Sequence, residues 1–310
     1  MDSLAAAPGT GPATSPLPTL RTPRPRASFD RLPTDRAVLL GILNVTPDSF
    51  SDGGSYNSLD TAIAHGLRMF YAGADIIDIG GESTRPGAAE VDPKTEQERI
   101  MPVVEAMVKA GALVSVDTRH AETAATAIDA GAALINDVSG MSVSPEMVAL
   151  VAERKVPYVL MHRRGDSKTM DSLTSYRNTV PEVIAELKEA REAFYAAGVA
   201  PEQLIIDPGI GFSKTADQNW ELLDKLELFH QLGHRILVGT SRKRFLGSLL
   251  STAGKAAAPA ERDHATVATT ALAAAKGAWG VRVHEVTGNL HAAKVAARMT
   301  LAHQNAAARH

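Results

Sequence analysis

Residues able to do polar chemistry follow each of eight short apolar runs of the sequence. The first four runs end at Asn44, at Glu82-Ser83-Thr84-Arg85, at Asp117 and at Asn136-Asp137. The last four lead into His162, Asp207, Thr240-Ser241-Arg242-Lys243 and the pair Arg282 and His284. Carboxylates, amides, guanidinium groups and imidazoles can bind polar ligands and stabilise charge that develops during a reaction. The ends of the apolar runs are therefore the expected place of an active site.

The stretches between the runs are each long enough for a helix, so strands and helices are expected to alternate. We predict strands over 38–44, 75–80, 113–117, 133–137, 157–161, 203–207, 235–239 and 279–283. Helices are predicted over 59–72, 94–110, 120–130, 145–154, 180–197, 217–230, 262–277 and 288–304, with a short one from Arg242. Polar groups at the carboxyl ends of eight such strands predict an α/β fold, the (β/α)8 TIM barrel. An open doubly wound sheet is disfavoured because no GxGxxG follows the first strand.

The composition favours one large enzyme domain. Of 310 residues, 45% are hydrophobic and only 5% are aromatic, so aliphatic packing must form the core. A net charge of −3 gives no reason to expect nucleic-acid binding. The absence of cysteine excludes disulfides, thiolate metal sites and cysteine nucleophiles. No window holds 18 consecutive apolar residues and no secretory signal is visible, so we expect a cytoplasmic protein that does not span a membrane.

The first 35 residues differ in composition from the rest of the chain. They hold seven of the 17 prolines, together with many alanines, threonines and serines. No periodic apolar face is visible there. We therefore predict a disordered N-terminal extension over 1–35 and a single barrel domain over 36–310.

Several strand-end residues suggest chemistry individually. Asn44 ends an apolar strand, where its neutral amide oxygen could be a ligand of a hard cation such as Mg²⁺. Arg85 lies among glycines and a proline, and its planar guanidinium suits phosphate, although an exposed loop arginine is often only solvated. Arg282 and His284 are two residues apart and therefore face the same side of the sheet. Taken alone, Asp117 could instead cap a helix, and His284 could be a structural histidine.

Seven segments resemble the dihydropteroate synthases, a family of pterin-binding barrels. GILNVTPDSFSDGG, GGESTRPGA, SVDT, INDVSG, DPGIGF, GTSRKRFLG and RVHEV occur in that family's order and rough spacing. The resemblance extends over about 38–300 and departs from the family pattern mainly within 162–177 and 251–264. It implies the condensation of 6-hydroxymethyl-7,8-dihydropterin diphosphate with 4-aminobenzoate, which yields 7,8-dihydropteroate and pyrophosphate.

The resemblance also implies roles for individual residues. The pterin pocket is expected to contain Asp117, Asn136, Met161, Asp207 and Lys243. Pyrophosphate is expected to bind Asn44, Thr84, Arg85, Arg282 and His284. The residues expected to bind 4-aminobenzoate are Ser49, Phe50, Pro86, Phe212, Ser241 and Lys243. Catalysis is assigned to Asp117, Asp207, Lys243 and Arg85. Phe212 could equally be a core ring, and His162 receives no role.

The implied chemistry needs no strong general base, because a neutral arylamine is already nucleophilic. We expect an SN1-like loss of pyrophosphate assisted by Mg²⁺ near Asn44, with Asp117 and Asp207 stabilising the electron-poor ring. The loops after the first two strands are expected to close over the aminobenzoate and exclude water. The resemblance further implies a homodimer through helices near the C-terminus, and a family that is a target of sulfonamides.

Two rival functions are considered. A noncatalytic relative could keep the barrel as a partner or regulator, but such a protein is expected to lose pocket residues that are present here. Another pterin-barrel enzyme, such as a methyltetrahydrofolate methyltransferase, is disfavoured by the SRK and RVH motifs together with NVTPDSFSDGG.

Overall fold

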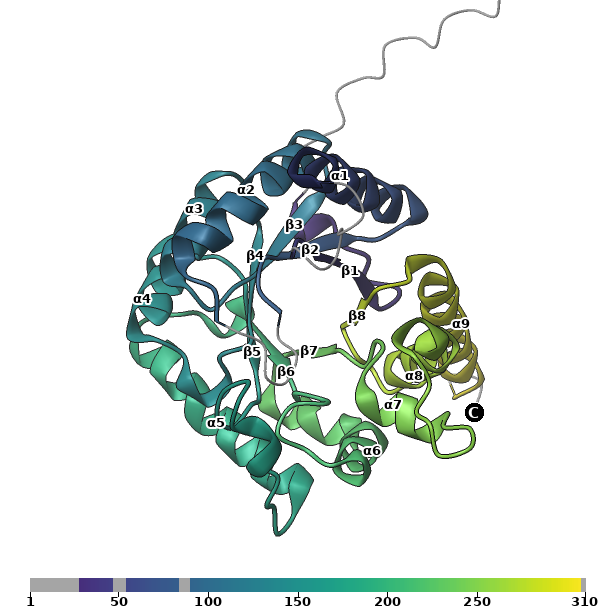
Figure 1. Ribbon diagram of the computed structural model, residues 1–310. Coiled ribbons are helices and arrows are strands. Elements are labelled where there is room, and N and C mark those ends of the chain that lie inside the picture. Colours follow the sequence, from purple (N-terminus) through teal and green to yellow (C-terminus); the bar gives the residue numbers. More distant parts are fainter. Residues whose placement is uncertain (1–27, 47–53, 84–89, 308–310) are drawn as a thin grey trace, which may run out of the picture.

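The computed structural model describes residues 28–46, 54–83 and 90–307. Within these ranges, eight parallel strands follow one another in chain order and close into a barrel, with the last strand beside the first. Helices surround the strands, as Figure 1 shows. The fold is the (β/α)8 TIM barrel predicted from the alternation of apolar runs and helical stretches.

Every predicted strand is present, and its bounds differ from the prediction by no more than one residue. The strands are β1 Val38–Asn44, β2 Ile76–Gly80, β3 Leu113–Asp117, β4 Leu134–Asp137, β5 Tyr158–Met161, β6 Leu204–Asp207, β7 Arg235–Val238 and β8 Gly280–Val283. Short apolar segments that end in polar residues were therefore a sound guide to the barrel wall.

The helices are α1 Gly54–Ala72, α2 Pro93–Lys109, α3 Ala121–Asp129, α4 Pro145–Arg154, α5 Thr179–Ala196, α6 Ala216–Asp224, α7 Arg244–Leu249, α8 Asp263–Ala275 and α9 Val286–Ala307. The prediction that α6 runs to residue 230 was wrong. Lys225, with φ −106° and ψ 29°, leaves the helical conformation, and a 3-10 helix over Leu226–Leu232 follows. Across the described ranges, no helix is both long and apolar enough to cross a membrane.

Side-chain caps fix the starts of α2, α4 and α6 within the described ranges, and Asp92 caps the first of them. Ser144 caps α4, and Pro145 occupies the first helical turn, as predicted. Thr215 caps α6 in a capping box with Gln218. Because Thr215 directly follows the loop after β6, this cap fixes one end of a loop that enters the functional site.

An aliphatic layer, here called the plug, closes the amino-terminal end of the barrel interior. It consists of Val38, Leu40, Ile76, Leu113, Leu134, Val159, Ile205 and Leu237, which come from seven strands. The eighth strand contributes Gly280, at which a Cβ would lie 3.2 Å from Leu237 Cδ1. The strand residues that alternate with the plug residues, such as Ile77 and Val114, pack outward against the helices in a separate, larger core. Whether a strand residue faces the barrel interior thus depends on its place in this alternation.

Residues 28–35 pack below the plug, so the predicted disordered extension over 1–35 is wrong for this segment. Phe29–Arg31 form a 3-10 helix, and the Phe29 ring stacks on Trp279 with 5.8 Å between centroids. Phe29 and Leu32 both contact the plug. Two apolar residues give no periodic signal, and their burial depends on a barrel end built by the rest of the chain. Residues 1–27 lie outside the described residues.

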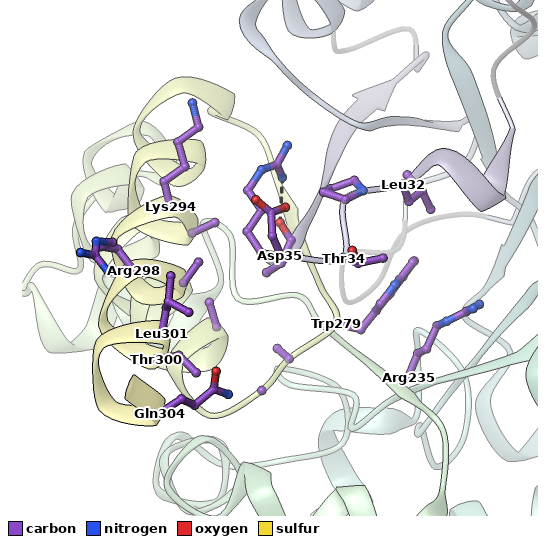
Figure 2. A pocket seen from close by; sticks show the side chains of 18 of the residues that line it. Leu32, Thr34, Asp35, Arg235, Trp279, Lys294, Arg298, Thr300, Leu301 and Gln304 are labelled. Carbon is purple, nitrogen blue, oxygen red and sulfur yellow. Dashed lines mark hydrogen bonds between the residues drawn. The ribbon is translucent and has the colours of Figure 1, made fainter. Parts of the chain in front are cut away.

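A hollow of about 1010 Å³ lies beside this segment, at the amino-terminal end of the barrel. Figure 2 shows Leu32, Thr34 and Asp35 on one side of it, with Leu301 and Gln304 of α9 on another. No predicted site residue lines this hollow. The predicted site residues that the structure describes lie at the opposite end of the barrel.

Candidate active site

The carboxyl ends of the strands surround one pocket of about 1130 Å³. Nine of the predicted site residues line it, namely Asn44, Asn136, Met161, Asp207, Phe212, Ser241, Lys243, Arg282 and His284. Asp117 is not a lining residue, but its side chain is bonded to that of Arg282. The remaining predicted site residues lie outside the described residues, namely Ser49, Phe50, Thr84, Arg85 and Pro86. Polar groups from separate strand ends thus meet in one place.

The pleat of the strands explains why these groups face the interior. Side chains two residues apart on a strand point to the same face. The plug residues Ile76, Leu113, Leu134 and Ile205 are followed, two or four positions later, by Asp78, Asp117, Asn136 and Asp207. Each interior row is therefore aliphatic at the amino-terminal end and polar at the carboxyl end.

Arg282 joins two carboxylates at the bottom of the pocket. Its Nε donates to Asp78 Oδ2 at 2.5 Å, and its Nη2 donates to Asp117 Oδ2 at 2.6 Å. The same Asp78 oxygen accepts a hydrogen bond from Asn136 Nδ2 at 3.1 Å. Asp78 is fully buried, and Asp117 and Asn136 are nearly so. Four strands are therefore tied together by one buried polar network across the barrel.

Two carboxylates share one guanidinium in this network, so it carries a net negative charge when both are ionised. Burial lowers the pKa of Arg282, but Asp78 and Asp117 raise it by more, and the guanidinium stays protonated. Burial raises the pKa of Asp117 to about 7, against the opposing effect of Arg282. Asp78 Oδ1 is buried and has no hydrogen-bond partner within the described ranges. This excess of acceptors suits a ligand that presents several N–H groups.

Asp78 was not among the residues predicted from the sequence. It lies inside the apolar run ADIIDIGG, whereas the prediction considered the polar residues that follow such runs. The sequence did hold a signal for Asp78, because a carboxylate within an apolar run must be paired when it is buried. Asp78 also lies two residues after Ile76 and therefore faces the barrel interior as Ile76 does. The sequence did not show which residue pairs with it, since Arg282 lies 204 residues later in the chain.

A second charged cluster lies where β6 and β7 end. Lys243 Nζ donates to the carbonyl of Ile210 and lies 4.4 Å from the centroid of the Phe212 ring. Asp207 Oδ1 accepts the backbone N–H of Gly209 at 2.7 Å. Burial lowers the pKa of Lys243 to about 8, although Asp207 opposes the effect. Phe212 is half-buried against this cation and lines the pocket, so it is not the core ring considered as an alternative.

Ser241 and His284 lie together at the pocket wall. The Ser241 hydroxyl accepts the backbone N–H of His284 at 3.1 Å and lies 2.9 Å from its Nδ1. Arg282, two residues earlier, uses Nε and Nη2 for its carboxylate partners. Its Nη1 makes no hydrogen bond to any residue that the structure describes. A guanidinium edge and an imidazole therefore line the same pocket at the carboxyl end of β8.

A Mg²⁺ ion needs oxygen ligands, and the pocket can supply only part of such a set. No group of three or more histidine, aspartate or glutamate side chains that could enclose a metal is found among the described residues. Mg²⁺ commonly keeps several waters and takes only one or two protein oxygens together with substrate phosphates. Asn44 offers one amide oxygen at the pocket wall. This set fits a Mg²⁺ ion that binds together with a diphosphate.

Comparison with known proteins agrees with this geometry. Residues 40–284 match the family model of the pterin binding enzymes. The dihydropteroate synthase of Mycobacterium leprae is 49% identical over 259 residues, which are 83% of this chain and 91% of that protein. A Xanthomonas albilineans dihydropteroate synthase structure with 4-aminobenzoic acid is 42% identical, with a TM-score of 0.78 over 84% of this chain and 92% of that one. Another structure of the Xanthomonas enzyme, in complex with 7,8-dihydropteroate, has a TM-score of 0.76 at 40% identity, over 85% of this chain and 94% of that one. The chain therefore belongs to the pterin binding enzyme family, within the dihydropteroate synthases, which are transferases.

Proposed function

We propose that this pocket condenses 6-hydroxymethyl-7,8-dihydropterin diphosphate with 4-aminobenzoate through an SN1-like, Mg²⁺-assisted loss of pyrophosphate. The observation that carries the proposal is the network in which Arg282 joins Asp78 and Asp117 beneath a pocket lined by further cations. It puts an excess of acceptors at the bottom and positive groups around them. Those are the two environments that a pterin ring and a diphosphate require.

The pterin ring is assigned to the carboxylate side of the pocket. Its edge presents adjacent N–H groups, and a carboxylate can accept two such bonds in a charge-assisted arrangement. Asp207 and Asn136 line the pocket, and Asp117 is bonded to Arg282 beside them. Met161 lines the wall between them and offers an apolar surface for the ring face.

Pyrophosphate is assigned to Arg282 Nη1, His284 and Asn44. Negative charge grows on the pyrophosphate oxygens as the bond to the CH₂ group breaks, and fixed donors nearby lower the energy of that charge. Bound Mg²⁺, held by the Asn44 oxygen and the diphosphate, would neutralise part of it. Thr84 and Arg85, which lie outside the described residues, remain proposed partners on the basis of the family resemblance alone.

The acceptor, 4-aminobenzoate, is assigned to the side of the pocket formed by Phe212, Ser241 and Lys243. The Phe212 ring offers a flat surface for an aromatic ring, and Lys243 supplies a positive charge within reach of it. Ser49, Phe50 and Pro86 are proposed to complete this side when the loops close. A sulfonamide that imitates 4-aminobenzoate is expected to compete for the same position.

The cationic CH₂ group formed on departure of pyrophosphate is stabilised by electron release from the dihydropterin ring. Ionised Asp117 and Asp207 lie on the carboxylate side and favour that positive charge electrostatically. The neutral amine then attacks the CH₂ group, and the acidic arylammonium that forms loses its proton to the departing pyrophosphate or to water. No side chain therefore has to act as a strong base. Exclusion of water by the closed loops would prevent capture of the cation as the hydroxymethyl pterin.

A pyrophosphate-release assay tests the function directly. The purified protein is given the pterin diphosphate and Mg²⁺, with and without 4-aminobenzoate. We expect release that depends on the amine, inhibition by a sulfonamide, and loss of activity with a chelator that is reversed by added Mg²⁺. No turnover under any of these conditions would favour the noncatalytic relative.

Asp117→Asn tests the dissociative path. Loss of the carboxylate charge should lower kcat at least tenfold while the KM for 4-aminobenzoate changes less than about threefold, because the charge acts on the transition state. Asp217→Asn, on the exposed face of α6, is the matched control. A kcat within about threefold of the wild type would contradict the electrostatic role of Asp117.

We also propose that the protein is a homodimer that associates through α8 and α9. Large apolar side chains are exposed on these helices, among them Leu272, Val295 and Met299, which are 60%, 57% and 65% exposed. Light scattering of the wild type and of Met299→Glu tests this, since a buried charge in the interface should favour the monomer. A wild type that is monomeric at micromolar concentration would contradict the proposal.

A further inference from the structure

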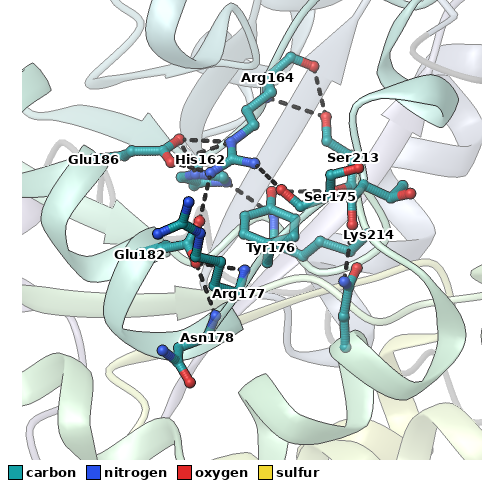
Figure 3. A network of polar contacts seen from close by, with 12 residues as sticks. His162, Arg164, Ser175, Tyr176, Arg177, Asn178, Glu182, Glu186, Ser213 and Lys214 are labelled. Atoms are coloured by element: carbon teal, nitrogen blue, oxygen red, sulfur yellow. Dashed lines mark hydrogen bonds and ion pairs between the residues drawn. The ribbon is translucent and has the colours of Figure 1, made fainter.

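His162 and Lys214 belong to a partly buried polar cluster beside the pocket, and the proposed reaction gives neither of them a role. Figure 3 shows this cluster, which also contains Arg164 and Glu186 of α5. His162 follows β5 and is fully buried. Lys214 follows β6 and lines the pocket. Neither residue was predicted from the sequence as part of the site.

Three acceptors surround the Nζ atom of Lys214. They are His162 Nδ1 at 2.9 Å, the carbonyl oxygen of Gly209 at 3.0 Å and that of Phe212 at 2.9 Å. An ammonium group has three N–H donors and no lone pair, so each proton has one acceptor here. A neutral amine has only two protons and could donate to only two of these three acceptors at once. The geometry therefore fits the charged form of the lysine.

The tautomer of His162 follows from this contact. Because Nδ1 accepts from Lys214, the ring proton lies on Nε2, which donates to Glu186 Oε2 at 3.0 Å. Burial lowers the pKa of His162 to about 4, so the ring is neutral near pH 7. Burial raises the pKa of Glu186, but the hydrogen bonds from His162 and Arg164 lower it to about 2. An ionised Glu186, itself held by Arg164, thus orients the imidazole toward Lys214.

The turn over 209–212 connects Lys214 with the pocket. Gly209 and Gly211 have φ values of 72° and 81°, a conformation that favours glycine. A Cβ at Gly209 would lie 1.8 Å from the carbonyl oxygen of His162, so the turn lies directly against the end of β5. The Gly209 N–H donates to Asp207, and the Phe212 N–H donates to the Gly209 carbonyl. Any shift of this turn therefore moves a pocket carboxylate and a pocket ring together.

We propose that Lys214 is a positioning residue whose ammonium group, oriented by His162, holds the turn over 209–212 so that Asp207 and Phe212 meet the two substrates. The inference rests on the proposed function, which assigns Asp207 to the pterin and Phe212 to 4-aminobenzoate. All three donors of Lys214 are used within the protein. Lys214 therefore acts through the turn and not by direct contact with a substrate.

The charge of Lys214 depends on pH. Burial lowers the pKa of Lys214 to about 7, while Asp207 raises it and Lys243 lowers it. The other charged and titratable groups that face it, from α5 and the end of β5, are Glu186, Arg164 and His162. As pH rises through this range, the ammonium loses a proton and one of its three acceptors loses a donor. The turn should then loosen, and activity should fall.

Lys214→Met removes all three hydrogen bonds and keeps most of the side-chain volume. Lys225→Met, at the exposed end of α6, is the matched control. We expect kcat/KM for 4-aminobenzoate to fall at least tenfold, mainly through KM, which corresponds to about 1.4 kcal/mol. The alkaline limb of the pH profile should also move upward from about pH 7 toward pH 8, where Lys243 titrates. Both variants are assayed where circular dichroism shows them fully folded.

Two substitutions of His162 separate its two contacts. In His162→Asn the amide oxygen can take the place of Nδ1 and accept from Lys214, but the contact with Glu186 is lost. In His162→Gln the amide nitrogen can take the place of Nε2 and donate to Glu186, but the Nδ1 acceptor is lost. If the contact with Lys214 is the one that supports activity, the kcat/KM of His162→Asn should be at least fivefold higher than that of His162→Gln. The reverse order would contradict the proposal.

The outcomes distinguish this inference from the proposed function. A wild type without amine-dependent pyrophosphate release contradicts the proposed function and the inference that rests on it. A wild type that turns over, together with a folded Lys214→Met variant that keeps both its kcat/KM and its alkaline limb, contradicts the inference alone. A Lys214→Met variant that is merely less stable, with unchanged KM values and pH profile, also overturns it.

Discussion

The two ends of the barrel interior come from the same strands and differ sharply in chemistry. At the amino-terminal end the interior rows hold the aliphatic plug, with Phe29 and Trp279 packed below it. At the carboxyl end the same rows hold carboxylates, an amide and an arginine. On β2 the change takes two residues, from Ile76 to Asp78, and both are fully buried. One end is suited to stability, and the other to binding.

Burial of side chains contributes to the free energy of folding with opposite signs at the two ends. Burial of an isoleucine side chain stabilises the fold by about 1.5–3 kcal/mol. Burial of a carboxylate costs several kcal/mol, which its partners offset only when their geometry is good. Asp78 has two partners for one oxygen and none for the other within the described residues. The polar end therefore adds little to stability, and the Asp78 oxygen that is unpaired in the described part of the chain is what a binding site for a hydrogen-bond donor would contain.

Asp78→Asn should give the largest effect. The amide leaves Arg282 with a single carboxylate partner and removes charge from the pterin side of the pocket. We expect kcat/KM to fall about 100-fold or more, which is about 2.7 kcal/mol of transition-state stabilisation. Pyrophosphate release measured at several pterin concentrations tests this, and a loss smaller than about fivefold would show that Arg282 does not need Asp78.

Ile76→Ala is the matched change two residues earlier on the same face of β2. We expect the free energy of unfolding to fall by about 2–5 kcal/mol, because a cavity replaces part of the plug. The kcat/KM of the folded fraction should stay within about threefold of the wild type. Urea unfolding and the same release assay measure both quantities. A loss of kcat/KM as large as that of Asp78→Asn would remove the distinction between the two ends.

The pH dependence of activity should come from the polar end alone. Asp117 has a raised pKa of about 7 and carries its negative charge only above that value. Lys243 has a lowered pKa of about 8 and carries its positive charge only below that value, and Lys214 adds to the same alkaline limb. We therefore expect a bell-shaped profile of kcat/KM that falls about tenfold per pH unit on its outer limbs. Ile76→Ala should keep this profile, and activity that still rises above about pH 9 would exclude these assignments.

Phe29→Ala should give the smallest effect. It removes a ring that stacks on Trp279 and that also contacts the guanidinium of Arg235, whose Cζ lies 5.1 Å from the ring centroid. We expect a loss of about 1 kcal/mol in the free energy of unfolding and no change in kcat/KM. Thermal unfolding measures the first, and the release assay the second. A measurable fall in kcat/KM would mean that the amino-terminal end communicates with the pocket.

The fold could be predicted from the sequence because its signals are local. Each strand is an apolar run of a few residues, and each is followed by a helix with its own start signal, such as Pro145 after Ser144. The place of the site was equally local, since polar residues follow the runs at the ends that meet in a barrel. Residues 28–35 were assigned wrongly because their order depends on contacts with Trp279 and the plug, distant in sequence.

The sequence by itself determined the order of the strands, the end of the barrel at which the chemistry lies, and the family resemblance of the motifs. Only the tertiary structure decided which charges neutralise one another. Arg282 was expected to bind pyrophosphate, but two of its nitrogens hold Asp78 and Asp117. His162 had no assigned role until its contact with Lys214 was visible. The physical reason is that periodicity fixes which way a side chain points, whereas pairing of buried charges depends on distances across the barrel that no local pattern encodes.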